Sequence, residues 1–353
     1  MSIKTDITNN TSPKSAWFIF PVLFLVLIVL FVLDIFLGSV SLKVGDVWNA
    51  LFSGGSGQIT ETIVLSFRLP KAVTAVLVGM ALSVSGLQMQ TIFRNPMAGP
   101  DILGITSGAS LGVAFVVLGF SGSFSPDFLK SFGNWMLAIA AWIGAGALMM
   151  IILALSIRIK DIMTILILGI MLSSGISAIV ILMQYFSSES LLKSYVVWTM
   201  GSLGNLTGNQ LTVLSISVFV GTALSIASSK MLNALLLGES YAKSMGLNVI
   251  AARIVVFVCS SILAGSVTAF CGPIGFIGIA VPHLGRLLLK TSDHSKLIPV
   301  TIMTGAAVML LSDIIAQLPG SGQNLPLNAV TSILGIPVVI WVIVKNRKFS
   351  GFY

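Results

Sequence analysis

Charged side chains are scarce in this sequence. Asp, Glu, Lys and Arg make up 8% of its 353 residues, while hydrophobic residues make up 56% and the mean hydropathy is +1.04. Soluble domains carry roughly 25% charged residues, so this composition excludes a water-soluble globule. Apolar runs of about 20 residues match the length that a helix needs to cross a hydrocarbon layer of about 30 Å. The sequence therefore predicts an all-α integral membrane protein, folded as one polytopic domain over residues 1–353.

Cysteine and histidine are nearly absent, with two of each. Cys259 and Cys271 lie about three turns apart on one expected helix, which is too far for a disulfide, so we interpret them as small buried hydrophobic residues. His283 and His294 cannot build a metal site by themselves, and no Cys/His cluster has the spacing of zinc ligands. We therefore predict no metal site in this chain.

Motifs for catalysis are missing as well. No glycine is followed directly by lysine, which excludes the phosphate loop of an ATPase, and no H-E-x-x-H pattern occurs. Both histidines are expected on the cytoplasmic side, away from any serine within the membrane. We therefore predict no catalytic residue and a chain that is not an enzyme.

Apolar length predicts ten membrane spans. They lie near residues 17–37, 72–92, 102–120, 135–155, 162–184, 211–229, 250–271, 273–289, 297–318 and 327–344. With the N-terminus inside, fourteen of the 19 Lys and Arg residues lie on the cytoplasmic side, and the five outside are Lys43, Arg68, Lys71, Lys130 and Lys193. This bias places both termini in the cytoplasm and explains the net charge of +8 without nucleic acid.

The loops divide the spans into two halves of five, separated by a cytoplasmic stretch over residues 230–250. An odd number of spans per half makes the second half enter from the opposite side, so the sequence predicts an inverted repeat with the solute path between the halves. Residues 1–16 form a cytoplasmic tail, and no cleavage site precedes Asp34, so we expect a retained first span. The loop over residues 38–66 is expected to pack over the external face.

The segment CGPIGFIGIAVPHLGRLLLK, residues 271–290, is an apolar run interrupted by glycine and proline. Such interruptions are tolerated at membrane depth where the freed backbone groups line a cavity or meet other helices. The words GPIGFIG, VPH and RL resemble the signature of the FecCD/BtuC-like permeases, which belong to ABC importers of iron-siderophores, haem or cobalamin. A second block over residues 68–112 resembles the same family, except that Gly99 stands where an acidic residue is common.

A third block over residues 324–343 resembles the family's tenth span, and Asp313 matches a family position on the ninth span. These blocks and Asp313 supply the residues for which we expect a structural role in the family motifs. Asp101 is expected to cap the helix that follows the NPMAGPD turn. Asp313, an acid within a span, is interpreted mainly as a structural pairing residue, while Asp34 lies near an outer end and could be solvated. The structural motif residues are Asn95, Pro96, Asp101, Gly272, Pro273, Gly275, Gly278, Pro282, His283, Asp313, Gly335 and Pro337.

A short amphipathic stretch over residues 234–249 resembles the family's cytoplasmic coupling helix, which inserts into a groove of the ATPase subunit. Glu239 and Lys243 have the spacing of an i,i+4 pair, which leaves Tyr241, Ala242 and Met245 for another surface. A solvated linker is the alternative without the family resemblance. The expected coupling residues are Gly238, Glu239, Ser240, Tyr241, Ala242, Lys243, Met245 and Gly246.

Arg68 and Lys71 lie at the outer mouth of the second span, where they could simply anchor a helix end. In the resembled family, the matching basic pair meets acidic residues of the substrate-binding protein, so the resemblance favours docking. A third basic position of some members is Gln317 here.

Gate candidates come from two places. The pattern WTMGSL, with Trp198, Gly201 and Ser202, resembles the family's short re-entrant helix beside the translocation gate. Ser173 and Ser174, together with Ser177, either line a gate or bond back to backbone carbonyls, and the sequence leaves both readings open.

Taken together, the resemblance implies a type II ABC importer permease in the bacterial inner membrane that works by alternating access. Its expected partners are a second copy of the chain, two ABC ATPase subunits that bind ATP and Mg, a periplasmic or lipid-anchored substrate-binding protein, and membrane lipid. We expect an iron(III)-siderophore as cargo, with haem and cobalamin as alternatives. An ion-coupled secondary carrier is a further alternative, although Asp34 and Asp313 are its only intramembrane acids.

Overall fold

The computed structural model describes residues 13–53, 57–119, 126–159, 161–204, 206–318 and 323–346. Within these ranges every regular element is a helix, as the composition predicts. The elements are α1 (Pro13–Phe36), α2 (Val44–Phe52), α3 (Gln58–Glu61), the π-helical η1 (Thr62–Arg68), α4 (Leu69–Ile92), the 3-10 helix η2 (Pro100–Leu103), α5 (Ile105–Ala114), the π-helical η3 (Phe115–Gly119), α6 (Pro126–Arg158), α7 (Ile162–Tyr185), α8 (Glu189–Thr199), α9 (Gly208–Ala227), α10 (Ser229–Leu236), α11 (Glu239–Ser244), α12 (Val249–Cys271), α13 (Ile277–Leu289), α14 (His294–Ala316) and α15 (Leu327–Asn346).

Seven helices in the described ranges are long and apolar enough to cross a membrane. Three further apolar helices are shorter, over Ile105–Gly119, Ile277–Leu289 and Leu327–Val342, and all ten coincide with the ten predicted spans. The eighth span is shorter than predicted because residues 272–276 leave α12 as non-helical chain, so α13 begins only at Ile277. The protein is therefore a polytopic helical membrane protein with broken or shortened spans at three places.

Polar residues at the helix starts explain several boundaries. A side-chain oxygen at each position accepts a backbone N–H of the first turn, which would otherwise have no partner. At α9, Thr207 and Gln210 form a reciprocal capping box. The other side-chain caps are Asp161 at α7, Asn248 at α12 and Asp293 at α14.

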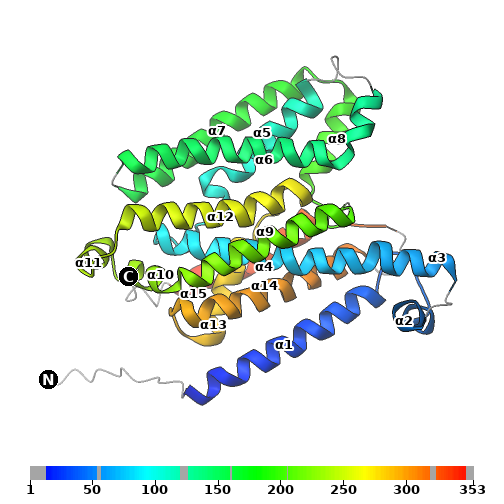
Figure 1. Ribbon diagram of the computed structural model, residues 1–353, viewed down its shortest axis with the longest axis horizontal. Helices are drawn as coiled ribbons and strands as arrows, with labels where there is room; N and C mark the ends of the chain where they lie inside the picture. Colours follow the sequence, from blue (N-terminus) through cyan, green and yellow to red (C-terminus); the bar gives the residue numbers. More distant parts are fainter. Residues whose placement is uncertain are drawn as a thin grey trace.

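Helix α4 is the centre of the packed structure (Figure 1), with 83% of its candidate span buried. It packs against α14, α12, α13 and α9. The approach to α13 is so close that a Cβ at Gly86 would overlap the carbonyl of Gly278, and a Cβ at Gly79 would overlap that of Gly305 on α14. Small residues at these crossings let the backbones touch, which is how helices pack without a hydrophobic driving force in lipid.

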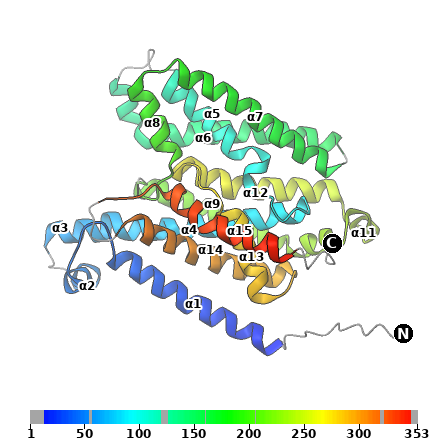
Figure 2. The same ribbon diagram turned by 180° about the vertical axis from the view of Figure 1, so that it is seen from behind.

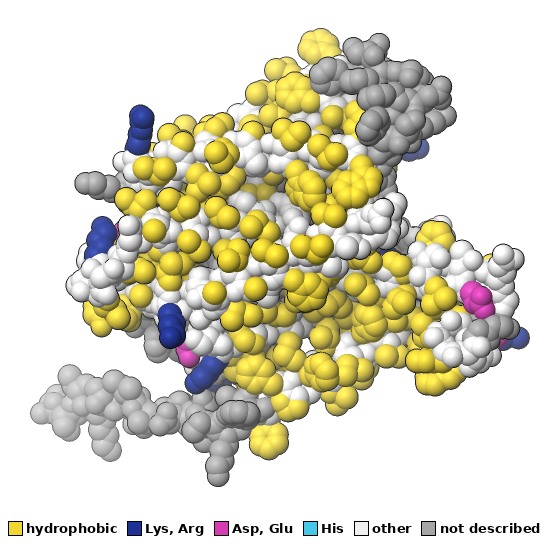
Figure 3. Space-filling model, viewed as in Figure 1, with side chains coloured by type: hydrophobic (Ala, Val, Ile, Leu, Met, Phe, Trp, Pro, Cys, Tyr) yellow, Lys and Arg dark blue, Asp and Glu magenta, His cyan; other side chains and the backbone are white. Residues whose placement is uncertain are grey.

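Helices α1 and α7 form opposite edges of the molecule, as both views show (Figures 1 and 2). Only 11% of the α1 span and 17% of the α7 span are buried, so these helices leave large apolar surfaces uncovered. The start of α1 and the end of α15 lie at the same end of the molecule as α10 and α11. In the view of Figure 3, most of the visible Lys and Arg side chains are at that end.

The loop between the first two spans is more ordered than the sequence indicated. Residues 38–66 contain α2, α3 and the first part of η1, and only the tip over residues 54–56 lies outside the described residues. Residues 1–12 of the tail predicted over residues 1–16 also lie outside the described residues. Residues 13–16 already belong to α1, which begins at Pro13, so the helix starts earlier than predicted. The inverted repeat and the side of the membrane on which the termini lie stay predictions.

Candidate functional site

The predicted coupling stretch over residues 234–249 is not one helix, which corrects the sequence prediction. Helix α10 ends at Leu236, the chain turns at Gly238 with φ +114°, and α11 follows as a separate helix of six residues. Glycine suits this turn because a Cβ strains the positive φ region. Ala242 is buried within this protein, so the expectation that it is left for another surface is wrong. Tyr241 and the C-cap residue Met245 are exposed, so α11 presents these side chains outward from the end of the molecule.

Glu239 does not pair with Lys243 as the spacing suggested. Its carboxylate instead forms an ion pair of 2.5 Å with the guanidinium of Arg253 on α12. Arg253 is only 1% exposed, and its Nη1 also donates to the carbonyl of Ile159 after α6 (3.3 Å). This arginine, which the sequence analysis missed, ties α11 to two membrane helices; an Arg inside an apolar run was the available signal.

The NPMAGPD turn and the 271–290 segment meet at the same end of the molecule. His283 Nε2 lies 2.8 Å from the carbonyl oxygen of Pro96, so this nitrogen carries the proton and donates. Asn95 Oδ1 accepts the backbone N–H of Met97 within the turn (2.9 Å). Arg286 donates to Gln90 on α4 (2.5 Å). The two blocks that carry the family resemblance therefore form one continuous contact between α4 and α13.

Asp101 does not cap α5, contrary to the prediction. It lies inside η2, and the residue before α5 is Gly104, which makes no side-chain cap. The Asp101 carboxylate instead accepts a hydrogen bond from the hydroxyl of Thr106, the second residue of α5. The prolines of the turn correctly predicted that a helix ends and another begins nearby, but α5 begins at Ile105, four residues after Asp101.

A cluster around His294 joins α4, α10 and α14, and the sequence analysis did not find it. Asn233 Oδ1 accepts from both the backbone N–H and Nδ1 of His294, and His294 Nε2 lies 2.8 Å from the Thr91 hydroxyl. The Asn233 amide donates to Asp293 (2.7 Å), and this bond lowers the pKa of the Asp293 carboxyl below its usual value. The cluster fixes the end of α10, from which α11 begins.

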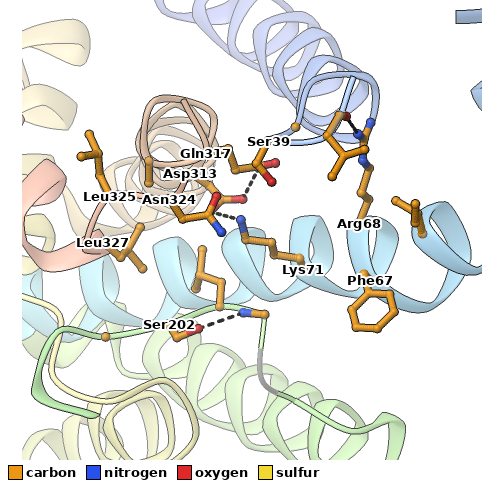
Figure 4. A pocket seen from close by; sticks show the side chains of 17 residues that line it. Ser39, Phe67, Arg68, Lys71, Ser202, Asp313, Gln317, Asn324, Leu325 and Leu327 are labelled. Carbon is orange, nitrogen blue, oxygen red and sulfur yellow. Dashed lines mark hydrogen bonds and ion pairs between the residues drawn. The ribbon is translucent and has the colours of Figure 1, made fainter. Parts of the chain in front are cut away.

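At the opposite end, the end of the second span that the sequence predicts to face outward holds a polar network (Figure 4). Lys71 forms an ion pair of 2.9 Å with Asp313, which confirms that this acid pairs within the chain. Gln317 donates to Asp313 (2.8 Å) and to Asp34 (2.9 Å). Asp34 is only 2% exposed, so the interpretation of a solvated acid is wrong; α14 covers it.

Arg68 is also buried rather than free at the surface. Its guanidinium donates to the carbonyls of Ile35 (2.9 Å), Phe36 (2.9 Å) and Val40 (2.5 Å), and so holds the chain that leaves α1. A cavity of about 470 Å³ opens beside these groups. It is lined by Arg68, Lys71, Ser202, Asp313, Gln317 and Asn324, among others.

The WTMGSL segment lies beside the broken 271–276 chain. Trp198 belongs to the last turn of α8, which covers Glu189–Thr199, so the short helix lies before Gly201 and Ser202 rather than through them. The Ser202 N–H donates to the carbonyl of Cys271 (2.8 Å). The backbone N–H of Asn328, at the start of α15, donates to the carbonyl of Met200. The side-chain Oδ1 of Asn328 accepts the backbone N–H of Gly275. Three predicted motifs therefore interlock here.

The α7 serines bond back to backbone carbonyls, which is one of the two interpretations that the sequence left open, and the gate interpretation stays a prediction. Ser173, Ser174 and Ser177 each donate to the carbonyl four residues earlier. They also line a shallow, open cavity of about 500 Å³ together with Asp101. Gly335 on α15 packs against the Phe276 side chain, and Pro337 lies two residues further along the helix. Both cysteines are buried and unpaired, as predicted.

No group of three His, Cys, Asp or Glu residues that could hold a metal occurs among the described residues. What the structure offers is two polar ends joined by broken spans, with an outward-facing helix at one end and a polar cavity at the other. Discontinuous and shortened spans of this kind are typical of membrane transport proteins, which build their solute path beside them.

The comparisons with known proteins identify the family. The model of the FecCD transport family matches residues 26–345, so this chain belongs to the FecCD family. The hemin transport system permease HmuU of Yersinia pestis is 35% identical, over 88% of this chain and 91% of HmuU. The vitamin B12 import system permease BtuC of Citrobacter koseri is 34% identical, over 87% of this chain and 90% of BtuC.

A solved structure agrees with the sequence comparisons. It is described as an inward-facing conformation of a putative metal-chelate type ABC transporter and is 29% identical. It superposes with a TM-score of 0.81 over 95% of this chain and 100% of the other. The chain is therefore a transport permease subunit and not an enzyme, and its family implies ATPase subunits and a substrate-binding protein as partners.

Proposed function

We propose that this chain is the membrane subunit of an inner-membrane ABC importer that takes up a bulky metal chelate. The first candidate cargo is an iron(III)-siderophore. Haem and cobalamin are equally compatible with the relatives, since HmuU is named for hemin and BtuC for vitamin B12. Two copies of the chain, two ATPase subunits and one periplasmic or lipid-anchored binding protein would form the complex, in membrane lipid and with no nucleic acid.

The observation that carries this proposal is the way α11 is held. The helix presents Tyr241 and Met245 outward, while Glu239 and Arg253 connect it to α12 and to the end of α6. A partner that pushes on α11 can therefore act directly on two membrane helices. In the proposed cycle, ATP binding closes the ATPase dimer, α11 moves, and the cavity between the copies changes the side to which it opens.

Docking of the binding protein at the outer mouth is part of the proposal. Arg68 and Lys71 line the polar cavity there, next to Ser202 of the gate segment. An acidic side chain of the binding protein would have to compete with Asp313 for Lys71, because these two already form an ion pair. Ser173, Ser174, Trp198 and Gly201 stay gate candidates.

The first experiment measures ATPase activity of the complex, purified in nanodiscs after co-expression with its ATPase subunit. Tyr241→Arg places a charge on the outward face of α11 and is expected to abolish assembly or coupled activity. Tyr185→Arg is the matched control, because Tyr185 is also an exposed tyrosine but is the last residue of α7, outside the proposed coupling surface. If no ATPase co-purifies and both variants behave as wild type, the import proposal is wrong, and an ion-coupled carrier acting through Asp313 becomes the better hypothesis.

The cargo is decided by a second measurement. The reconstituted complex with its binding protein is loaded in turn with ferric siderophore, haem and cobalamin, and uptake into proteoliposomes is followed with ATP inside. Uptake of haem or cobalamin alone would contradict the siderophore proposal and leave the importer intact.

A further inference from the structure

Helix α2, which follows the first span, has an uncovered apolar face. Val47 and Ala50 point into the protein and are buried. Val44, Trp48 and Phe52 are spaced by four residues, so they share one face, and they are 69%, 56% and 70% exposed. The rings of Trp48 and Phe52 contact each other at 4.6 Å between centroids. The exposed stripe is thus a continuous apolar surface rather than scattered side chains.

A polar stripe runs beside it. Gly45 and Asn49 are exposed on the next face of the helix, and Lys43 is exposed directly before its first residue. A nine-residue helix with one face on protein, one apolar and one polar matches the pattern of helices that lie in a membrane–water interface. Tryptophan is enriched at that depth, and a cation there can reach lipid phosphate.

The position of α2 agrees with such a location. It begins eight residues after Phe36, the last residue of α1, and it packs against α3 and η1, which extend α4 beyond the other spans. In Figures 1 and 2 it is drawn nearly end-on while α1 and α4 run across the picture, so its axis crosses the direction of the spans. A helix that crosses the spans at their end lies along the membrane plane.

We propose that α2 is an interfacial anchor, with Val44, Trp48 and Phe52 inserted into the lipid at the membrane face where α1 ends. Such helices bury their apolar face about 5–10 Å into the boundary between headgroups and acyl chains. The neighbouring surface is continuous with lipid, because α1 is only 11% buried and exposes Phe24, Leu25 and other large apolar side chains.

The binding protein is the competing occupant, and the structure disfavours it. The proposed docking residues Arg68 and Lys71 line the polar cavity, whereas the exposed stripe of α2 has no charged or polar group with which an acidic docking surface could pair. Helix α2 also lies at the α1 edge of the molecule, while the gate candidates on α7 and α8 lie at the other edge. The inference rests on the membrane spans and uses the proposed import function only in excluding this competitor.

Site-directed labelling tests the proposal in the full complex. The chain's own cysteines are 1% and 3% exposed, so single cysteines introduced by Val44→Cys and Phe52→Cys can be labelled with an environment-sensitive fluorophore. Asn49→Cys is the matched control on the polar stripe of the same helix. In nanodiscs containing lipids that are spin-labelled near the headgroup, the labels at positions 44 and 52 are expected to emit at shorter wavelength and to be quenched several-fold more than the label at position 49. Aqueous iodide is expected to quench in the reverse order.

Equal quenching by iodide at all three positions would overturn the proposal, because the stripe would then face water. It would also be overturned if the labels at positions 44 and 52 became shielded only after purified binding protein was added, since the stripe would then be a protein contact. None of these readouts depends on ATPase activity or cargo, so failure of the anchor and failure of the import function are separable.

Discussion

Arg253 shows how much one buried side chain can connect in this protein. It lies on α12, pairs with Glu239 of α11 and donates to Ile159 after α6. A buried charge requires partners of this kind, because removing one of them leaves the other desolvated and unpaired. The same contacts that satisfy Arg253 also transmit any displacement of α11.

Replacing Arg253 with methionine is expected to uncouple ATP hydrolysis from transport. The change leaves Glu239 without its partner at a cost of roughly 1–3 kcal/mol, at the lower end because the Glu239 side chain is 27% exposed. The measurement is ATPase stimulation by loaded binding protein in proteoliposomes. Lys230→Met is the control, because Lys230 is an exposed cation on the neighbouring helix α10 and lies outside the expected coupling residues. An equal loss in both variants would contradict the role of Arg253.

The contact of α4 with α13 at Gly86 leaves no room for a side chain. Gly86→Leu would force α4 and α13 apart, since even a Cβ would overlap the Gly278 carbonyl, and overpacking of this kind costs about 1–3 kcal/mol or more. We expect the variant to lose its monodisperse peak on size exclusion in detergent. Gly175→Leu in α7, where a Cβ would meet nothing within 4 Å, should behave as wild type. A well-folded Gly86→Leu protein would show that the crossing is looser than the structure indicates.

At the scale of elements, the start of α14 depends on a capping acid. Asp293 accepts the Ser295 N–H (3.0 Å) and the Asn233 amide, and these bonds lower its pKa relative to the unfolded chain. A group whose folded pKa is lowered stabilises the fold above its unfolded pKa of about 4, and this contribution disappears as the pH falls through the folded value.

Asp293→Ala is therefore expected to reduce stability at pH 7 by about 0.5–1 kcal/mol, the lower part of the range for a lost N-cap. The difference from wild type should shrink as the pH is lowered below 4. Thermal unfolding in detergent at both pH values measures this, with Asp293→Asn as a control that keeps a capping oxygen. A constant difference at all pH values would mean that the charge of Asp293 plays no part.

The ion pair between Lys71 on α4 and Asp313 on α14 bears on docking of the substrate-binding protein. Asp313 holds Lys71 within the chain, so Asp313→Asn should free this cation for an acidic partner. We expect the binding protein to associate roughly three- to tenfold faster at low ionic strength, with little difference at high salt, because steering by charge is screened. Surface plasmon resonance on nanodiscs measures the rate. Lys71→Met should slow association; an unchanged rate in both variants would remove Lys71 from the docking surface.

At the scale of the whole molecule, the start of α1, helix α11 and the end of α15 lie at the same end, so both termini should lie on the same side of the membrane as α11. Both termini should be cytoplasmic, as the excess of Lys and Arg at that end indicates. A fluorescent protein fused to either terminus should be bright, whereas a cysteine at Asn324, which is exposed beside the polar cavity, should react with an impermeant reagent added from outside. Labelling of position 324 only after the membrane is opened would invert the topology.

Much of the fold could be predicted from the sequence, because lipid leaves few choices. A chain in hydrocarbon must satisfy its backbone internally, so apolar runs of span length become helices, and the ten spans follow from composition and length. The glycine and proline interruptions at 272–282 also marked where a span is shortened and where the interlocking motifs meet. The boundaries of short elements were less predictable: α11 is only six residues long, and α5 starts after Gly104 rather than at Asp101.

The partners of the charged side chains were decided by the tertiary structure alone. Local spacing favoured Glu239 with Lys243, but burial of Arg253 without a counter-charge would cost more than leaving a lysine in water, so Glu239 pairs with Arg253. Lys71 and Asp313 come together because glycines on α4 and α14 allow these distant helices to touch. The sequence by itself determined that this is a helical permease of the FecCD type, since composition and motif words are local properties. Which side chains meet depends on how each helix is rotated and packed, and only the folded chain determines that.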